Sequence, residues 1–258
     1  MSNSTRTTSQ AGFALLAITT IMLGACGDVT SAVGEKGNVI YSLYTVYESD
    51  VSDLTKVGIL TRHQQRIDTQ LTSQGSQKVD DPGNLVHRVS PPEGATITQV
   101  DDGYDVPDVL ITVTTPGTYT LETYNGDELF ERVKLRFEHP VEVSLVTWIS
   151  PADGDEFKKI SGDNIPATKG SQVAFVPIPK GEDGQRILGD ISFNMVSDPP
   201  GGAMRVKNLF GVYEDGIWYS AEPVSFVLLD AGTITITIED SLAPSVKGTK
   251  IFKVTPSP

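Results

Sequence analysis

The segment that decides the fold is Gly232-Thr-Ile-Thr-Ile-Thr-Ile238, in which isoleucine and threonine alternate strictly. Side chains at every second position of a strand point to the same face, so the isoleucines share one face and the threonines share the other. Alternation of β-branched residues with one apolar face is typical of a strand that covers a core on one side only. The segment therefore predicts a half-buried β-strand.

The period of two recurs along the chain, beginning with Val39–Tyr47. No window after residue 26 carries a long apolar stripe at the helical spacing i, i+3, i+4, i+7. Many short strands separated by turn residues are typical of an all-β sandwich or barrel. The further strands that this pattern predicts are Asp108–Thr114, Thr118–Tyr124, Leu129–Glu138, Val141–Ile149, Gln172–Pro177, Ile191–Ser197, Val224–Leu229 and Lys250–Val254.

Three pairs of segments repeat in the same order, at a nearly constant offset of about 110 residues. A repeat of that length is too long for one unit of a solenoid and has the size of an independent β-sandwich. The sequence therefore predicts two copies of one sandwich, in residues 38–139 and 140–258. The matched pairs are Val89–Ala95 with Val196–Ala203, Val109–Gly117 with Val224–Gly232, and Lys134–Pro140 with Lys250–Pro256.

The turn and strand Pro116-Gly-Thr-Tyr-Thr-Leu121 resembles the corresponding segment of bacterial immunoglobulin-like and PKD-like repeats. This resemblance implies two tandem immunoglobulin-like sandwiches. Tyr119 stands where a tyrosine corner could form, whereas the second copy has Ile234 there. The joint Glu138–Val141 has no Gly/Ser-rich spacer, and Pro140 stiffens it. We expect the sandwiches to stack end to end with little hinge freedom.

The N-terminus carries an export signal. An uncharged apolar run, Ala11–Leu23, follows a polar segment with one cation, Arg6, and precedes small residues. That order predicts a cleaved signal peptide over residues 1–25, because the run is shorter than the roughly 20 residues of a membrane span. The motif Leu23-Gly24-Ala25-Cys26 resembles the lipobox of bacterial lipoproteins. The resemblance implies that Cys26, the only cysteine of the chain, carries lipid and becomes the mature N-terminus.

The residues after the lipobox motif are small and polar. Residues 26–37 are therefore expected to form the lipidated cysteine and a flexible tether, with a reach of roughly 20 Å. The lipid would attach the protein to the bacterial cell envelope. In the lipoprotein family an Asp directly after the cysteine retains the protein at the inner membrane. This chain has Gly27 there, which favours the outer membrane.

Composition narrows the possible partners. The chain has 33 acidic and 20 basic residues, which gives a net charge of −13. Such an acidic balance argues against binding to nucleic acid or to an anionic lipid surface, because both attract Lys and Arg.

The sequence offers few groups for catalysis. His63, His87 and His139 are far apart in the chain and lack a metal-ligand spacing such as H-E-x-x-H. The motifs G-x-S-x-G, the Walker loop and G-x-G-x-x-G after a strand are absent, and Cys26 would be lipidated. We therefore expect no enzymatic activity.

Two acidic segments could hold calcium, which prefers clustered oxygen ligands. The first contains Asp101, Asp102, Asp105 and Asp108, and the second is Asp153–Glu156. Neither matches the calcium loop D-x-[DN]-x-[DN]-G, and Asp and Gly are also ordinary turn residues. Calcium is the one cofactor that the sequence suggests.

The segment Phe210–Tyr219 is rich in aromatic residues and contains the turn signal Asp215-Gly216. A two-residue turn there places Tyr213 opposite Trp218 on one face of a hairpin, and Val212 opposite Tyr219 on the other. The register does not decide which face is buried. If Tyr213 and Trp218 are exposed, they are the candidate ligand-binding residues, because such rings dominate binding hot spots. If they point inward, they cover the core.

These observations favour a lipid-anchored envelope protein with a non-catalytic binding or adhesion role towards a protein or a glycan. The alternative is a structural spacer or an accessory subunit of an envelope assembly.

Overall fold

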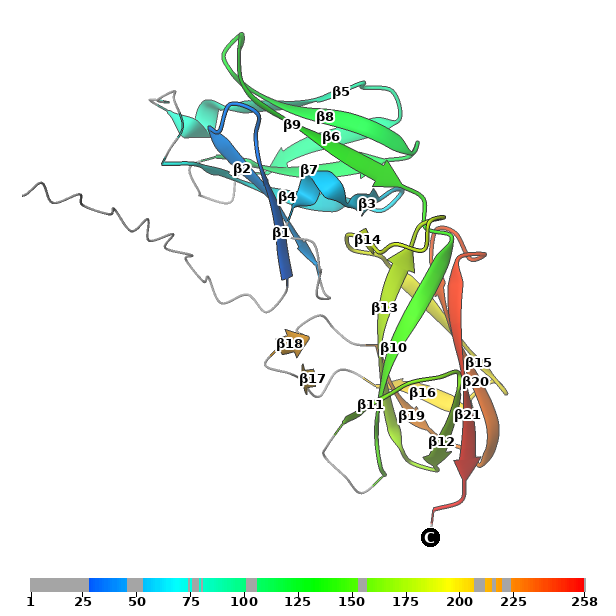
Figure 1. The fold of residues 1–258 in the computed structure, drawn as a ribbon. Coiled ribbons are helices and arrows are strands. Elements are labelled where there is room, and N and C mark those ends of the chain that lie inside the picture. Colours follow the sequence, from blue (N-terminus) through cyan, green and yellow to red (C-terminus); the bar gives the residue numbers. More distant parts are fainter. Residues whose placement is uncertain are drawn as a thin grey trace, which may run out of the picture.

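The computed structural model describes residues 28–45, 53–73, 75, 79, 81–100, 106–152, 157–206, 212–214, 217–219 and 224–257. The chain forms two β-sandwiches (Figure 1). The fold is all-β, as the period of two predicted. Among the described residues, no helix is long or apolar enough to cross a membrane.

The first sandwich consists of two five-stranded sheets. One sheet has the antiparallel order β1-β2-β4-β7-β6. The other has the order β14-β3-β9-β8-β5, in which β3 runs parallel to both β14 and β9. The elements are β1 Asp28–Val33, β2 Val39–Thr45, the 3₁₀ helix η1 Leu54–Lys56, β3 Gly58–Leu60, β4 Gln65–Leu71, the 3₁₀ helix η2 Pro82–Asn84, β5 Val86–Ser90, β6 Ala95–Val100, β7 Asp108–Val113, β8 Gly117–Asn125 and β9 Glu128–Glu138.

The second sandwich has a five-stranded sheet β11-β10-β13-β19-β16 and a four-stranded sheet β12-β21-β20-β15. A separate hairpin of β17 and β18 lies between β16 and β19 in the chain. The strands are β10 Glu142–Ser150, β11 Lys158–Ile160, β12 Asn164–Thr168, β13 Gln172–Lys180, β14 Ile187–Leu188, β15 Phe193–Asp198, β16 Ala203–Val206, β17 Val212–Glu214, β18 Ile217–Tyr219, β19 Val224–Leu228, β20 Gly232–Asp240 and β21 Lys247–Thr255.

The repeat in the sequence is also a repeat of topology. The order β2-β4-β7-β6 matches β10-β13-β19-β16, and β3-β9-β8-β5 matches β12-β21-β20-β15. Even the parallel pair recurs, as β3 with β9 and β12 with β21. Tandem sandwiches are therefore observed.

Strand β20 has the burial that its alternation predicted. Ile234, Ile236 and Ile238 are buried in the second core, and the threonines between them face the other side. In the first sandwich Tyr119 forms the expected corner, because its hydroxyl donates to the Thr115 carbonyl at 2.9 Å.

The tether prediction is wrong for Asp28–Val33, which form β1 at the edge of the first sandwich. Thr30 and Ala32 are buried, whereas Val29 and Val33 are 44% and 59% exposed. The inward residues are small or polar and the outward ones are apolar, so the segment lacks the usual pattern of a half-buried strand. Pairing with β2 and burial of two small side chains nevertheless keep it in the sheet.

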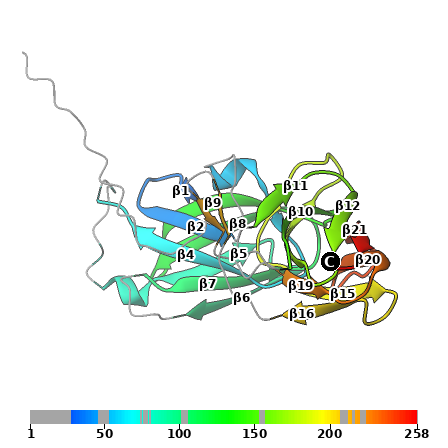
Figure 2. The ribbon, with the colours of Figure 1, turned by 90° about the horizontal axis from the view of Figure 1, so that it is seen from below.

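The two sandwiches are bent at their junction. In Figure 1 the strands of the first sandwich run across those of the second, and Figure 2 shows the same crossing from below. The end-to-end stack expected from the short joint is therefore a stack with a sharp bend. The boundary at residues 139 and 140 stays a prediction, because β14 of the later part pairs with β3 of the earlier part.

Candidate functional site

The junction is built around β14, which the second sandwich contributes to a sheet of the first. Ile187 pairs with Gly58, and Leu188 pairs with Ile59, in parallel register. Both residues of β14 are buried, and Leu188 belongs to the core of the first sandwich. The core thus continues across the junction, so the two sandwiches are held in one arrangement.

A buried hydrogen bond between side chains also joins the sandwiches. His63 follows β3 and lies 2.8 Å from Asp240, the last residue of β20, measured from Nε2 to Oδ1. The Ser192 backbone N–H donates to His63 Nδ1 at 3.4 Å, so Nε2 is the nitrogen that donates to the carboxylate. Asp240 Oδ1 also accepts from the Leu242 N–H, whereas Oδ2 has no partner among the described residues.

The amide of Gln65 makes a second link. Its Oε1 accepts from the Asp190 N–H at 2.7 Å, and its Nε2 donates to the Asp190 carbonyl at 3.0 Å. This approach needs Gly189, where an added Cβ would lie 2.3 Å from Gln65 Oε1 and φ is +131°. The Gln65 amide therefore bonds to the N–H and the carbonyl of Asp190 as the backbone of a neighbouring strand would.

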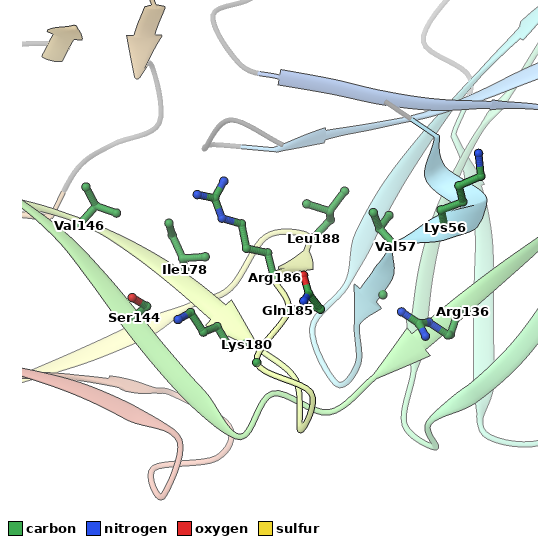
Figure 3. A pocket seen from close by; sticks show the side chains of 12 residues that line it. Lys56, Val57, Arg136, Ser144, Val146, Ile178, Lys180, Gln185, Arg186 and Leu188 are labelled. Carbon is green, nitrogen blue, oxygen red and sulfur yellow. The ribbon is translucent and has the colours of Figure 1, made fainter. Parts of the chain in front are cut away.

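Next to this junction lies a cleft of about 390 Å³, between β3, β9 and η1 of one sandwich and β10, β13 and β14 of the other (Figure 3). Its volume falls within the usual range for small-ligand sites. Four of the described lining residues are cationic and none is acidic, although the chain has a net charge of −13. The lining residues are Lys56, Val57, Gly58, Arg136, Ser144, Val146, Ile178, Lys180, Gly184, Gln185, Arg186 and Leu188.

Acidic side chains pair with Lys56 and Arg136. The Arg136 Nε lies 2.7 Å from Glu138, and the Lys56 ammonium lies 3.0 Å from Asp53. Hydrogen bonds from the Thr55 side chain, and then from Lys56, lower the pKa of Asp53, so this carboxylate stays charged. The side chains of Lys56 and Arg136 are 72% and 48% exposed, so each cation can also reach another anion.

The other two cations come from one turn of the second sandwich. Lys180 ends β13, and Arg186 forms an isolated antiparallel bridge with it. The Gly181 N–H donates to the Gln185 carbonyl at 3.0 Å and closes the turn. A hydrogen-bonded turn thus holds both side chains at the same side of the cleft, opposite Lys56 and Arg136 from the first sandwich.

Sequence reasoning missed this cleft, since its cations come from segments far apart in the chain. The alternation in β9 indicates only that Arg136 faces outward, and nothing in the sequence places it near Arg186. The tertiary arrangement alone brings the four charges together.

The structure describes only part of the predicted calcium site. Asp101, Asp102 and Asp105 lie outside the described residues, as do Asp153–Glu156. Asp108 is buried in the first sandwich, where it pairs with the Arg66 guanidinium and accepts from the Thr69 N–H at 2.9 Å. These contacts occupy both of its oxygens. Among the described residues, no cluster of three His, Cys, Asp or Glu could hold a metal.

The hairpin prediction is confirmed for the strand register. Tyr213 pairs with Trp218, and Val212 pairs with Tyr219. The turn Asp215-Gly216 lies outside the described residues, as does Cys26. Whether the rings bind a ligand stays a prediction.

Replacing both Tyr213 and Trp218 by Ala should lower stability little if the rings face solvent, as a binding role requires. Equilibrium denaturant unfolding measures this, with Val212→Ala/Tyr219→Ala as the matched pair from the other face. A loss of about 3–5 kcal/mol in the first pair would instead make these rings part of the core.

No family model matches the chain, and no curated protein matches it. Among solved structures, domains 4 and 5 of the S-layer protein SbsC share 14% identity, over 89% of this chain and 98% of that chain, with a TM-score of 0.30. The Escherichia coli adhesin FdeC shares 12% identity, over 91% and 67%, with a TM-score of 0.28. The Yersinia pseudotuberculosis adhesin InvE shares 12%, over 76% and 56%, with a TM-score of 0.26. At this level of similarity, the fold class rests on the sheets described above.

Proposed function

We propose that this protein is an exported lipoprotein, anchored to the bacterial cell envelope through Cys26, with the outer membrane as its preferred location. We further propose that its sandwiches have a non-catalytic binding or adhesion role towards a protein or a glycan. The observation that carries the anchor is the motif Leu23–Cys26, which contains the only cysteine of the chain. A lone cysteine in an exported protein has no internal disulfide partner, and acylation accounts for it.

Support for a non-catalytic role comes from the three histidines, each of which has a structural partner. His63 pairs with Asp240, and His139 hydrogen-bonds to the Thr61 hydroxyl. His87 Nε2 donates to the Pro107 carbonyl, and burial lowers the pKa of His87 to about 4. A buried neutral imidazole whose nitrogens are both engaged is poorly placed to exchange protons with a substrate.

The second candidate is a spacer or accessory subunit of an envelope assembly. The junction favours it, because β14 and the pair of His63 with Asp240 fix one sandwich against the other. A rigid bent rod suits a spacer. The two candidates differ in whether the cleft or the hairpin recognises a ligand.

Replacing Cys26 by Ala is expected to move the protein from the membrane fraction to the soluble fraction or to leave an uncleaved precursor. Fractionation and incorporation of labelled palmitate measure the change. A Cys26→Ala protein that partitions as the wild type does, together with a wild type that takes up no label, would rule out the anchor. Separation of inner and outer membranes on a density gradient then tests the preferred location.

A further inference from the structure

The start of the ordered fold lies close to the cationic cleft. A single residue, Gly27, separates Cys26 from the first residue of β1. Ser31 of β1 forms a parallel bridge with Asp53, and Asp53 caps η1, which ends at Lys56. Lys56 lines the cleft. One short 3₁₀ turn therefore connects the cleft with the strand that leads back to the proposed lipid.

This connection limits how far the cleft can lie from an anchored Cys26. The segment from Cys26 to Ser31 spans at most about 17 Å when fully extended. The flexible tether that the sequence predicted would have allowed the domain to move away from the headgroups, but β1 removes most of it. A lipid on Cys26 thus holds the Lys56 side of the cleft near the membrane surface.

The net charge of the chain does not prevent contact with anionic groups there. At physiological ionic strength the Debye length is about 8 Å, so acidic residues farther away are largely screened. Four cations, Lys56, Arg136, Lys180 and Arg186, line the cleft, and no acidic side chain is among its described lining residues. The expectation that the acidic chain avoids anionic lipid concerns its average surface and stays a prediction.

The chemistry of the cleft favours a phosphate ester. Guanidinium groups form paired hydrogen bonds with phosphate oxygens, and ammonium groups add point charges. The apolar side chains of Val57, Val146 and Leu188 also line the cleft and could contact the carbon part of an ester. We propose that this cleft binds a phosphate ester, and that the headgroups of the membrane carrying the anchor supply it. The choice of the membrane as source rests on the proposed lipidation of Cys26.

The test uses the full chain, purified from whole cells in a neutral detergent and examined by native mass spectrometry. The probes are short-chain phosphatidylglycerol, glycerol 3-phosphate and zwitterionic short-chain phosphatidylcholine. An oligogalacturonate, which carries carboxylates and no phosphate, tests whether the cleft binds any polyanion. The cleft variant is Lys180→Gln/Arg186→Gln. The matched control is Lys134→Gln/Lys247→Gln, which removes two exposed cations that do not line the cleft. If the cleft variant unfolds, Lys56→Gln/Arg136→Gln replaces it.

We expect the wild type to bind phosphatidylglycerol more tightly than phosphatidylcholine. The cleft variant should weaken that binding about tenfold or more, since it removes two charge-assisted contacts, while the control stays within about twofold. Binding of both phosphate esters, or of glycerol 3-phosphate alone, supports the site and, in the latter case, identifies a soluble source. Absence of binding to both esters, equal losses in both variants, or binding of the oligogalacturonate instead would overturn the proposal. Because detergent replaces the membrane, this result is independent of whether Cys26 is acylated.

Discussion

Replacing His63 by Ala is expected to lower the free energy of unfolding by about 2–3 kcal/mol, because it leaves the buried carboxyl group of Asp240 without its imidazole hydrogen-bond donor. Asp240 has no exposed surface, and its Oδ2 has no partner among the described residues. Without His63, Asp240 Oδ1 keeps the hydrogen bond from the Leu242 N–H and loses the one from the imidazole. Equilibrium unfolding in urea measures the loss.

The control is a double-mutant cycle with Asp240→Asn, which removes the charge and keeps the shape. If the buried carboxylate is the cause, His63→Ala/Asp240→Asn should be more stable than His63→Ala alone. A His63→Ala protein within about 0.5 kcal/mol of the wild type would show that the pair does not hold the sandwiches together.

A comparably large loss, about 3 kcal/mol, is expected for Gly248→Ala in β21, because overpacking against a fixed backbone cannot relax. An added Cβ would lie 2.2 Å from the Val143 carbonyl oxygen and 2.9 Å from the Leu145 side chain. Both residues belong to β10 and to the core of the second sandwich. The substitution therefore separates the two sheets of that sandwich. Thermal unfolding followed by circular dichroism measures it.

Gly83→Ala serves as the matched control. An added Cβ there would meet only Asp81 Oδ1, at 3.6 Å, which is an ordinary contact. Its effect should stay below about 0.5 kcal/mol. Equal losses at the two glycines would mean that the close approach to β10 does not explain the result.

The period of two and the internal repeat were sufficient to predict the fold class. They succeeded because each core strand presents one apolar face, as Ile234, Ile236 and Ile238 do in β20. Strand β1 was missed, since its buried positions hold Thr30 and Ala32 and its exposed positions hold valines. Its place in the sheet depends on pairing with β2, and a period within one segment does not record pairing.

By itself, the sequence determined the all-β class, the duplication and the hairpin register, because each depends on patterns that can be read along the chain. The anchor at Cys26 stays a prediction from the sequence. Only the tertiary structure decided the bend between the two sandwiches, the pairing of β14 with β3 of the first sandwich, and the cationic cleft. In the cleft, Lys56, Arg136 and Arg186 come together from segments that are far apart in the sequence. Their positions follow from how two sandwiches pack, and local spacing contains no information about that packing.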